Sequence, residues 1–131
     1  MSVVVVDAAT VVDLICNFPA AQPCRRALAS ATAVAAPAHL DADVLSALGH
    51  LQRTGRLTRA ADRVDALAAF GATRWPLRPL LPPAWALVDR IAVRDALYVA
   101  LAASLDAVLV TAEGSLRRAA AGIVAVAEPD G

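Results

Sequence analysis

The 131-residue sequence contains no lysine: its 12 basic residues are all arginine, balanced by 12 acidic residues. The absence of lysine excludes every mechanism that needs a catalytic lysine. A net charge of zero also argues against a broad electrostatic grip on nucleic acid. A local patch of arginine side chains remains compatible with this balance.

Cysteine is scarce, and long apolar runs are missing. Cys16 and Cys24 lack the spacing of a metal site, so we expect them to be small, buried apolar groups. No stretch approaches the roughly 20 apolar residues of a membrane span. The short N-terminal apolar run lacks the preceding basic region of a signal peptide. We therefore expect a cytoplasmic protein with one domain, residues 1–131.

Short apolar segments alternate with helical patterns along the chain. We expect strands at residues 3–6, 31–35, 73–77, 107–111 and 123–127. We expect helices at residues 10–16, 23–30, 37–53, 58–70, 93–105 and 115–121, with Pro37 opening one and Thr58 capping another. A short helix is expected within residues 80–89, after Pro82 and Pro83. The alternation predicts an α/β fold, a three-layer α/β/α sandwich with a central parallel sheet. In such folds the site lies beyond the carboxyl ends of the strands.

Four acidic residues stand out in this arrangement. Asp7 follows the apolar strand VVVV, and Glu113 follows the strand AVLVT. Asp95 lies near the start of helix 93–105, which is apolar nearly all round and is therefore expected to be buried. Asp43 lies in the segment AHLDADVLSAL.

Each of these acids also has a purely structural interpretation. Asp7 could cap the helix that follows it. Asp95 and Glu113 could favour the positive ends of their helices, an effect of about 0.3–1 kcal/mol. Asp43 could simply be solvated, and helical periodicity does not choose between it and Asp41 as the residue nearer the core.

Taken together, the four acids indicate a metal site. Carboxylates gathered at one sheet edge repel each other, and burial alone would raise their pKa values. A divalent cation resolves this conflict, and oxygen ligands suit Mg²⁺ or Mn²⁺. Such a metal can bind a phosphodiester, lower the pKa of a bound water and orient it for in-line attack.

Other side chains complete the sequence-based hypothesis. Arginines near the rim could bind neighbouring phosphates of such a phosphodiester substrate, the candidates being Arg94, Arg74 and Arg78. His39 and His50 lie eleven residues apart in one expected helix. With no third ligand nearby, we expect them to be surface histidines rather than zinc ligands.

The order of VVVVDAAT, APAHLDADVLSAL and LLPPAWALVDRIAVRDALYVALAASLDAVLVTAEGSL resembles that of PIN-domain proteins, and more closely of the VapC toxins of bacterial toxin–antitoxin pairs. The resemblance covers nearly the whole chain, and RDALYVALAASLDAVLVTAE is its most specific part. It implies a Mg²⁺- or Mn²⁺-dependent endoribonuclease that cuts RNA, often tRNA or ribosomal RNA. Such proteins are usually dimeric and are neutralised by a cognate VapB antitoxin.

The resemblance also implies which residues carry the chemistry. The catalytic and metal-binding acids of the family correspond to Asp7, Asp43, Asp95 and Glu113. Asp43 stands where a glutamate is usual and Glu113 where an aspartate is usual, so charge is kept but reach is not. A misplacement near 1 Å can cost about a hundredfold in rate. Ala9 stands where a serine is common, and Thr10 could partly replace that hydroxyl.

Other enzyme classes match the sequence less well. A receiver domain needs a lysine, and a haloacid-dehalogenase-type phosphatase needs D-x-D where this chain has D-A-A. No G-x-x-x-x-G-K-[ST] loop is present. The remaining alternative is a catalytically weakened PIN-like domain that acts mainly by binding RNA or its antitoxin. An apolar patch formed by helices 10–16, 37–53 and 58–70 could serve as the docking groove for an antitoxin helix.

Overall fold

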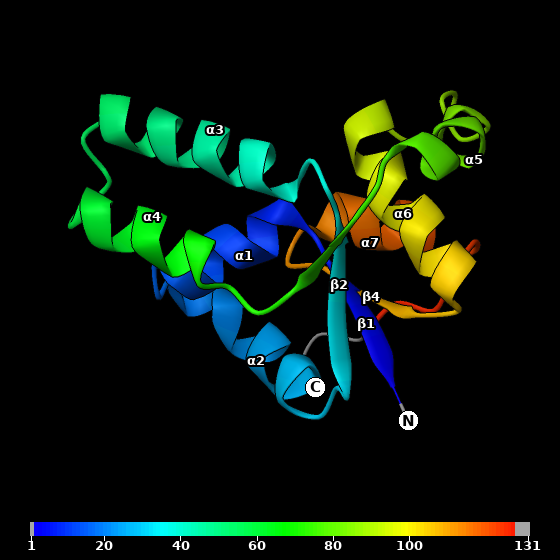
Figure 1. Cartoon of the computed structure of the whole chain (residues 1–131), viewed down its shortest axis with the longest axis horizontal. Helices are drawn as coiled ribbons and strands as arrows, with labels where there is room; N and C mark the ends of the chain where they lie inside the picture. Colours follow the sequence, from blue (N-terminus) through cyan, green and yellow to red (C-terminus); the bar gives the residue numbers. More distant parts are fainter. Residues whose placement is uncertain (1, 128–131) are drawn as a thin grey trace.

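Four parallel strands form the central sheet of the computed structural model, which describes residues 2–127 (Figure 1). The strands are β1 (Val3–Val6), β2 (Ala33–Pro37), β3 (Thr73–Trp75) and β4 (Val108–Val110). Their order across the sheet is β3-β2-β1-β4, so Val5 of β1 pairs with Ala35 on one side and with Leu109 on the other. Val5 and Val6 are fully buried, as expected of a β-branched run in the middle of a parallel sheet.

Helices cover both faces of this sheet. They are α1 (Ala8–Ile15), α2 (Gln22–Ala29), α3 (Leu40–Arg53), α4 (Ala60–Ala68), α5 (Leu81–Trp85), α6 (Val93–Leu105) and α7 (Gly114–Ala120), with 3-10 turns η1 (Pro19–Ala21) and η2 (Arg78–Leu80). In Figure 1 the strands run through the middle of the view, with α1, α2 and α4 on one side and α5 and α6 on the other. The three-layer α/β/α architecture predicted from the sequence is confirmed. No helix within residues 2–127 has the length and apolar character needed to cross a membrane.

Helix α6 is buried as its apolar sequence predicts. Residues 96–102 are all buried, and the helix contacts β1, β2 and β4. Tyr98, Leu101 and Val99 are among the largest fully buried side chains of the protein. Packing against three strands therefore fixes the start of α6, where Asp95 lies in the first turn.

Two helices do not begin as expected: α3 does not start at Pro37, and α4 is not capped by Thr58. Pro37 is the last residue of β2, and α3 begins three residues later, because the strand pairing continues with the Ala38 N–H donating to the Trp75 carbonyl at 2.8 Å. Thr58 is not the cap of α4. Arg59 holds that position in the left-handed conformation, with φ of 55°, and its side chain makes no capping hydrogen bond.

Several expected elements begin or end at other residues than the sequence pattern indicates. The strand predicted at residues 73–77 ends at Trp75, because Pro76 lacks the N–H that a ladder needs. The short helix expected within residues 80–89 is α5, but it begins at Leu81 and so includes Pro82 and Pro83 in its first turn instead of following them. The strand predicted at residues 123–127 is reduced to one parallel bridge between Leu109 and Val126. Proline and tertiary pairing, rather than hydrophobicity, set these boundaries.

Candidate active site

An open pocket of about 500 Å³ lies where β1 and β4 end. Its lining side chains come from four separate parts of the chain and are Asp7, Ala8, Ala9, Asp43, Ala92, Arg94, Asp95, Tyr98, Glu113 and Ser115. All four acids predicted from the sequence therefore share one pocket, at the carboxyl edge of the sheet as expected. Of the three candidate arginines, Arg94 lines this pocket.

Asp7 is both the N-cap of α1 and part of the pocket wall. Its Oδ1 accepts hydrogen bonds from the Thr10 N–H at 3.0 Å and the Thr10 hydroxyl at 2.5 Å. Its Oδ2 accepts a hydrogen bond from the Thr111 hydroxyl at 2.6 Å. The structural interpretation of Asp7 as a helix cap is thus confirmed, and it does not exclude a ligand role. Thr10 also supplies the hydroxyl that Ala9 lacks.

The carboxylates of the pocket disfavour each other's ionisation. Burial raises the pKa of Asp7, opposed by the hydrogen bonds from Thr10 and Thr111, and the charge of Asp95 adds a smaller rise. Burial also raises the pKa of Asp95, and the nearby Glu113 raises it further. A bound cation would offset both the desolvation and the repulsion.

Asp43 is held at its two oxygens by different partners. Its Oδ2 accepts a hydrogen bond from the Tyr98 hydroxyl at 2.9 Å and lies 3.3 Å from His39 Nε2. Its Oδ1 forms an ion pair with Arg94 Nη2. Asp41, the alternative by periodicity, instead pairs with Arg74 outside this pocket. The side-chain contacts with Tyr98 and Arg94 of α6 therefore distinguish Asp43 from Asp41.

The expectation that His39 is a surface histidine is wrong. Its side chain is 12% exposed, and its ring packs on the ring of Tyr98 with centroids 4.8 Å apart. Burial is the main cause of a lowered pKa for His39. The error arises because His39 precedes α3 rather than lying on its solvent face. His50, by contrast, is exposed as predicted.

Glu113 occupies the exposed rim of the pocket. It is the N-cap residue of α7, and its backbone N–H donates to the Thr111 hydroxyl oxygen at 2.9 Å. The Ser115 hydroxyl donates to Glu113 Oε1 at 3.3 Å. Thr111 therefore bonds both to the Asp7 carboxylate and to the Glu113 backbone N–H. The longer glutamate side chain extends from this backbone position.

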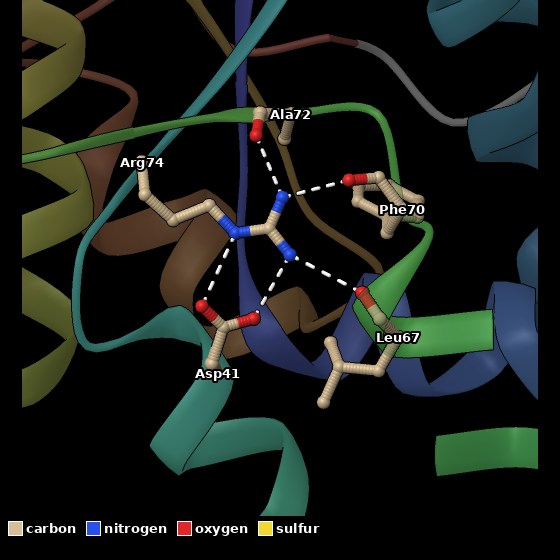
Figure 2. Close-up of polar contacts among 5 residues, drawn as sticks. All are labelled: Asp41, Leu67, Phe70, Ala72 and Arg74. Carbon is tan, nitrogen blue, oxygen red and sulfur yellow. Dashed lines mark hydrogen bonds and ion pairs between the residues drawn. The ribbon is translucent and has the colours of Figure 1, made fainter. Parts of the chain in front are cut away.

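Arg74 is committed to a structural cluster, which Figure 2 shows. Its Nε and Nη2 donate to the two carboxylate oxygens of Asp41, at 3.2 and 2.8 Å. The same guanidinium donates to the carbonyls of Phe70 at 2.7 Å, Ala72 at 2.6 Å and Leu67 at 3.3 Å. These bonds tie the first turn of α3 to the end of α4 and to β3. They count against an RNA-binding role for Arg74, which stays a prediction.

The chemistry of the pocket suits a hard divalent cation, but its acids are not yet gathered around one point. Four carboxylates are the donor set that Mg²⁺ or Mn²⁺ prefers. In the described range, however, no three His, Cys, Asp or Glu side chains are grouped closely enough to hold a metal ion. Asp43 is also paired with Arg94. A cation held by all four acids would need their side chains to rearrange and the pair between Arg94 and Asp43 to open.

Sequence reasoning missed three polar residues at the site, namely Tyr98, Thr111 and Ser115. Tyr98 carried a usable signal, since it is a polar residue three positions after Asp95 in an otherwise apolar helix, and such spacing places both on one face. Thr111 and Ser115 carried no comparable signal, because threonine and serine are common wherever a strand gives way to a helix.

The family comparison agrees with this geometry. The family model described as the PIN domain matches residues 4–122. The chain is a PIN-domain protein. A crystal structure of PAE2754 from Pyrobaculum aerophilum resembles this PIN-domain chain with a TM-score of 0.69 at 22% identity, covering 95% of this chain and 83% of that one. That likeness supports the fold.

Sequence relatives of this PIN-domain protein are named VapC. Ribonuclease VapC3 of Mycobacterium tuberculosis is 46% identical over 120 residues, covering 88% of this chain and 86% of the relative. Ribonuclease VapC1 of the same species is 37% identical over 122 residues, covering 88% and 89%. Ribonuclease VapC12 is 33% identical over 115 residues, covering 86% and 88%. The PIN-domain protein therefore belongs with the VapC proteins.

Proposed function

We propose that this protein is a divalent-metal-dependent endoribonuclease and the toxin of a VapBC-type toxin–antitoxin pair, acting in the cytoplasm. The observation that carries the proposal is the meeting of four acids, remote in sequence, in one pocket at the carboxyl edge of the sheet. The similarity to proteins named Ribonuclease VapC supports the same function.

The proposed ligands of the cation are the four acids of the pocket, Asp7, Asp43, Asp95 and Glu113. Mg²⁺ or Mn²⁺ bound there would supply Lewis acidity toward a phosphodiester and the water that attacks it. The hydroxyls of Thr10 and Thr111 hold the Asp7 carboxylate in one orientation, which preorganises the site.

The arginines at the rim have the proposed task of holding RNA phosphates. The Arg94 side chain lines the pocket and is 66% exposed, so its guanidinium can turn from Asp43 to a phosphate. Arg78 is also exposed and remains a candidate for the flanking RNA. Arg74 is the weakest of the three candidates, because its donors are already engaged.

The proposed partners are an RNA substrate, such as tRNA or ribosomal RNA, a VapB-type antitoxin and a second copy of the chain in a homodimer. An apolar pocket of about 680 Å³ supports the docking of an antitoxin segment. It lies between α1, α2 and α4 and is lined by Leu14, Ile15, Arg25, Leu28, Ala29, Ala66 and Phe70. The groove expected from the sequence included α3, but α2 takes its place here.

The test of the enzymatic proposal compares Asp95→Asn with the exposed control Asp89→Asn. We expect the wild-type chain to cleave cellular RNA with Mg²⁺ or Mn²⁺ and to stop on addition of EDTA. Asp95→Asn removes a charge from the pocket and is expected to reduce cleavage at least a hundredfold. Asp89 does not line the pocket, so Asp89→Asn should cleave like the wild type. Equal cleavage by both variants would refute the metal-site proposal.

A second candidate function is a binding protein with little catalysis. It is favoured by the contacts that already occupy the acids, since Arg94 pairs with Asp43 and three hydrogen bonds reach Asp7. This candidate predicts growth arrest that does not depend on metal and persists fully in Asp95→Asn. It also predicts tight antitoxin or RNA binding without cleavage products.

A further inference from the structure

His39 contacts the candidate site without lining its pocket. Its Nε2 lies 3.0 Å from the backbone carbonyl oxygen of Arg94 and 3.3 Å from Asp43 Oδ2. Both of these atoms are acceptors, so Nε2 carries a proton; it donates its hydrogen bond to the Arg94 carbonyl, while Asp43 Oδ2 lies close by as a polar contact. The other ring nitrogen, Nδ1, is buried and has no hydrogen-bond partner in the part of the chain that the structure describes. These contacts fix the tautomer of His39 and the orientation of its ring.

His39 joins the two helices that carry the acids. It directly precedes α3, which bears Asp43, while the Arg94 carbonyl belongs to the first turn of α6, next to Asp95. Its ring contacts the ring of Tyr98 at a tilt of 46°, and because Tyr98 is 1% exposed, this contact anchors the His39 ring against the core. The His39 side chain therefore links the start of α3, which carries Asp43, to the start of α6, which carries Asp95. These two acids are 52 residues apart in sequence.

The two oxygens of Asp43 have different surroundings. Oδ2 accepts a buried hydrogen bond from the Tyr98 hydroxyl at 2.9 Å and lies 3.3 Å from His39 Nε2. Oδ1 faces the guanidinium of Arg94, whose side chain is 66% exposed against 10% for Asp43. Contacts to a solvent-exposed arginine exchange readily, whereas buried hydrogen bonds are costly to break. Oδ2 is therefore the anchored oxygen and Oδ1 the exchangeable one.

We propose that His39 is a positioning residue, which together with Tyr98 holds Oδ2 so that Oδ1 of Asp43 faces the cation site when Arg94 moves away. This inference rests on the proposed function of the four acids. It assigns to His39 no contact with RNA or with the metal. The side chains that hold a ligand typically change metal affinity or activity by 10- to 100-fold when they are removed.

The test uses the full chain with Mn²⁺ alone as the probe, titrated by electron paramagnetic resonance, together with RNA-cleavage kinetics. In His39→Leu the hydrogen bond to the Arg94 carbonyl and the polar contact with Asp43 Oδ2 are lost. We therefore expect about tenfold or greater weakening of Mn²⁺ binding and a comparable fall in kcat, with KM for RNA changed less than about threefold. His39→Gln places an amide N–H near the position of Nε2 and should restore most of the loss. His50→Leu alters an exposed histidine of α3, the helix that His39 precedes, and is expected to behave like the wild type.

Wild-type Mn²⁺ affinity and kcat in a folded His39→Leu variant would overturn the inference alone. Equal losses in His39→Leu and His39→Gln, at unchanged melting temperature, would also refute a role through the N–H donor. If His39→Leu does not fold, Tyr98→Phe carries the test, because it removes only the hydroxyl that reaches Oδ2. A wild-type chain that neither binds Mn²⁺ nor cleaves RNA would refute the proposed function, and this inference with it.

Discussion

Replacing Arg74 by lysine separates a structural role from an RNA-binding role at this position. The Arg74 guanidinium makes five hydrogen bonds, two to Asp41 and three to the backbone carbonyls of residues 67, 70 and 72 (Figure 2). Lysine keeps the positive charge and most of the aliphatic stem. It cannot reproduce the planar fork that reaches both Asp41 and the carbonyls on the other side.

The contacts set the size of the expected effect. Each carbonyl bond contributes about 1 kcal/mol net, which gives about 3 kcal/mol for three. The pair with Asp41 adds less than about 1 kcal/mol, because the Asp41 side chain is 46% exposed. A lysine ammonium can retain one or two of these bonds, so the free energy of unfolding should fall by about 2 kcal/mol. For a domain of this size that corresponds to a fall in Tm of about 8 °C.

The assay is thermal and urea unfolding of Arg74→Lys beside Arg78→Lys, followed by RNA cleavage. Arg78 is exposed, so its replacement should change the free energy of unfolding by less than about 0.5 kcal/mol. If Arg74 instead grips RNA, the expected pattern is an unchanged Tm and a raised KM. A Tm for Arg74→Lys within 2 °C or so of the Arg78→Lys value would refute the structural reasoning.

Two further predictions concern buried groups. Thr111→Val removes the hydroxyl that donates to Asp7 Oδ2 at 2.6 Å. We expect the free energy of unfolding, measured in urea, to fall by about 1.5–3 kcal/mol, and the pKa of Asp7 to rise further. An unchanged unfolding midpoint would contradict this expectation. Cys16 and Cys24 are buried and free, and burial raises the pKa of both thiols. The folded chain thus holds the two thiol protons more tightly than the unfolded chain. The free energy of unfolding should therefore fall as the pH rises above about 8.5. Alkylation by iodoacetamide at pH 8, followed by mass spectrometry, should be more than about tenfold slower in buffer than in urea, and equal rates would count against burial of the thiols.

The outcomes for individual acids show how far local reasoning reaches. Asp7 was identified both as a helix cap and as a site residue, and each interpretation depends only on its place between a strand and a helix. Asp43 and Asp41 were indistinguishable, because helical spacing allows either to lie near the core. Only the position of α6, which brings Arg94 and Tyr98 to Asp43, separates them.

The sequence by itself determined the layered α/β fold, the burial of β1 and α6, and the place of Asp7 and Glu113 after strands that end at one sheet edge. These features follow from hydrophobic periodicity, which is read along the chain, and from the fact that parallel strands end at the same edge of a sheet. Only the tertiary structure decided the partners of each polar atom, such as Arg94 on Asp43 and His39 between α3 and α6. It also decided where Pro37 ends a strand. A hydrogen bond depends on distances of a few tenths of an ångström between segments dozens of residues apart, and packing of the core alone sets those distances.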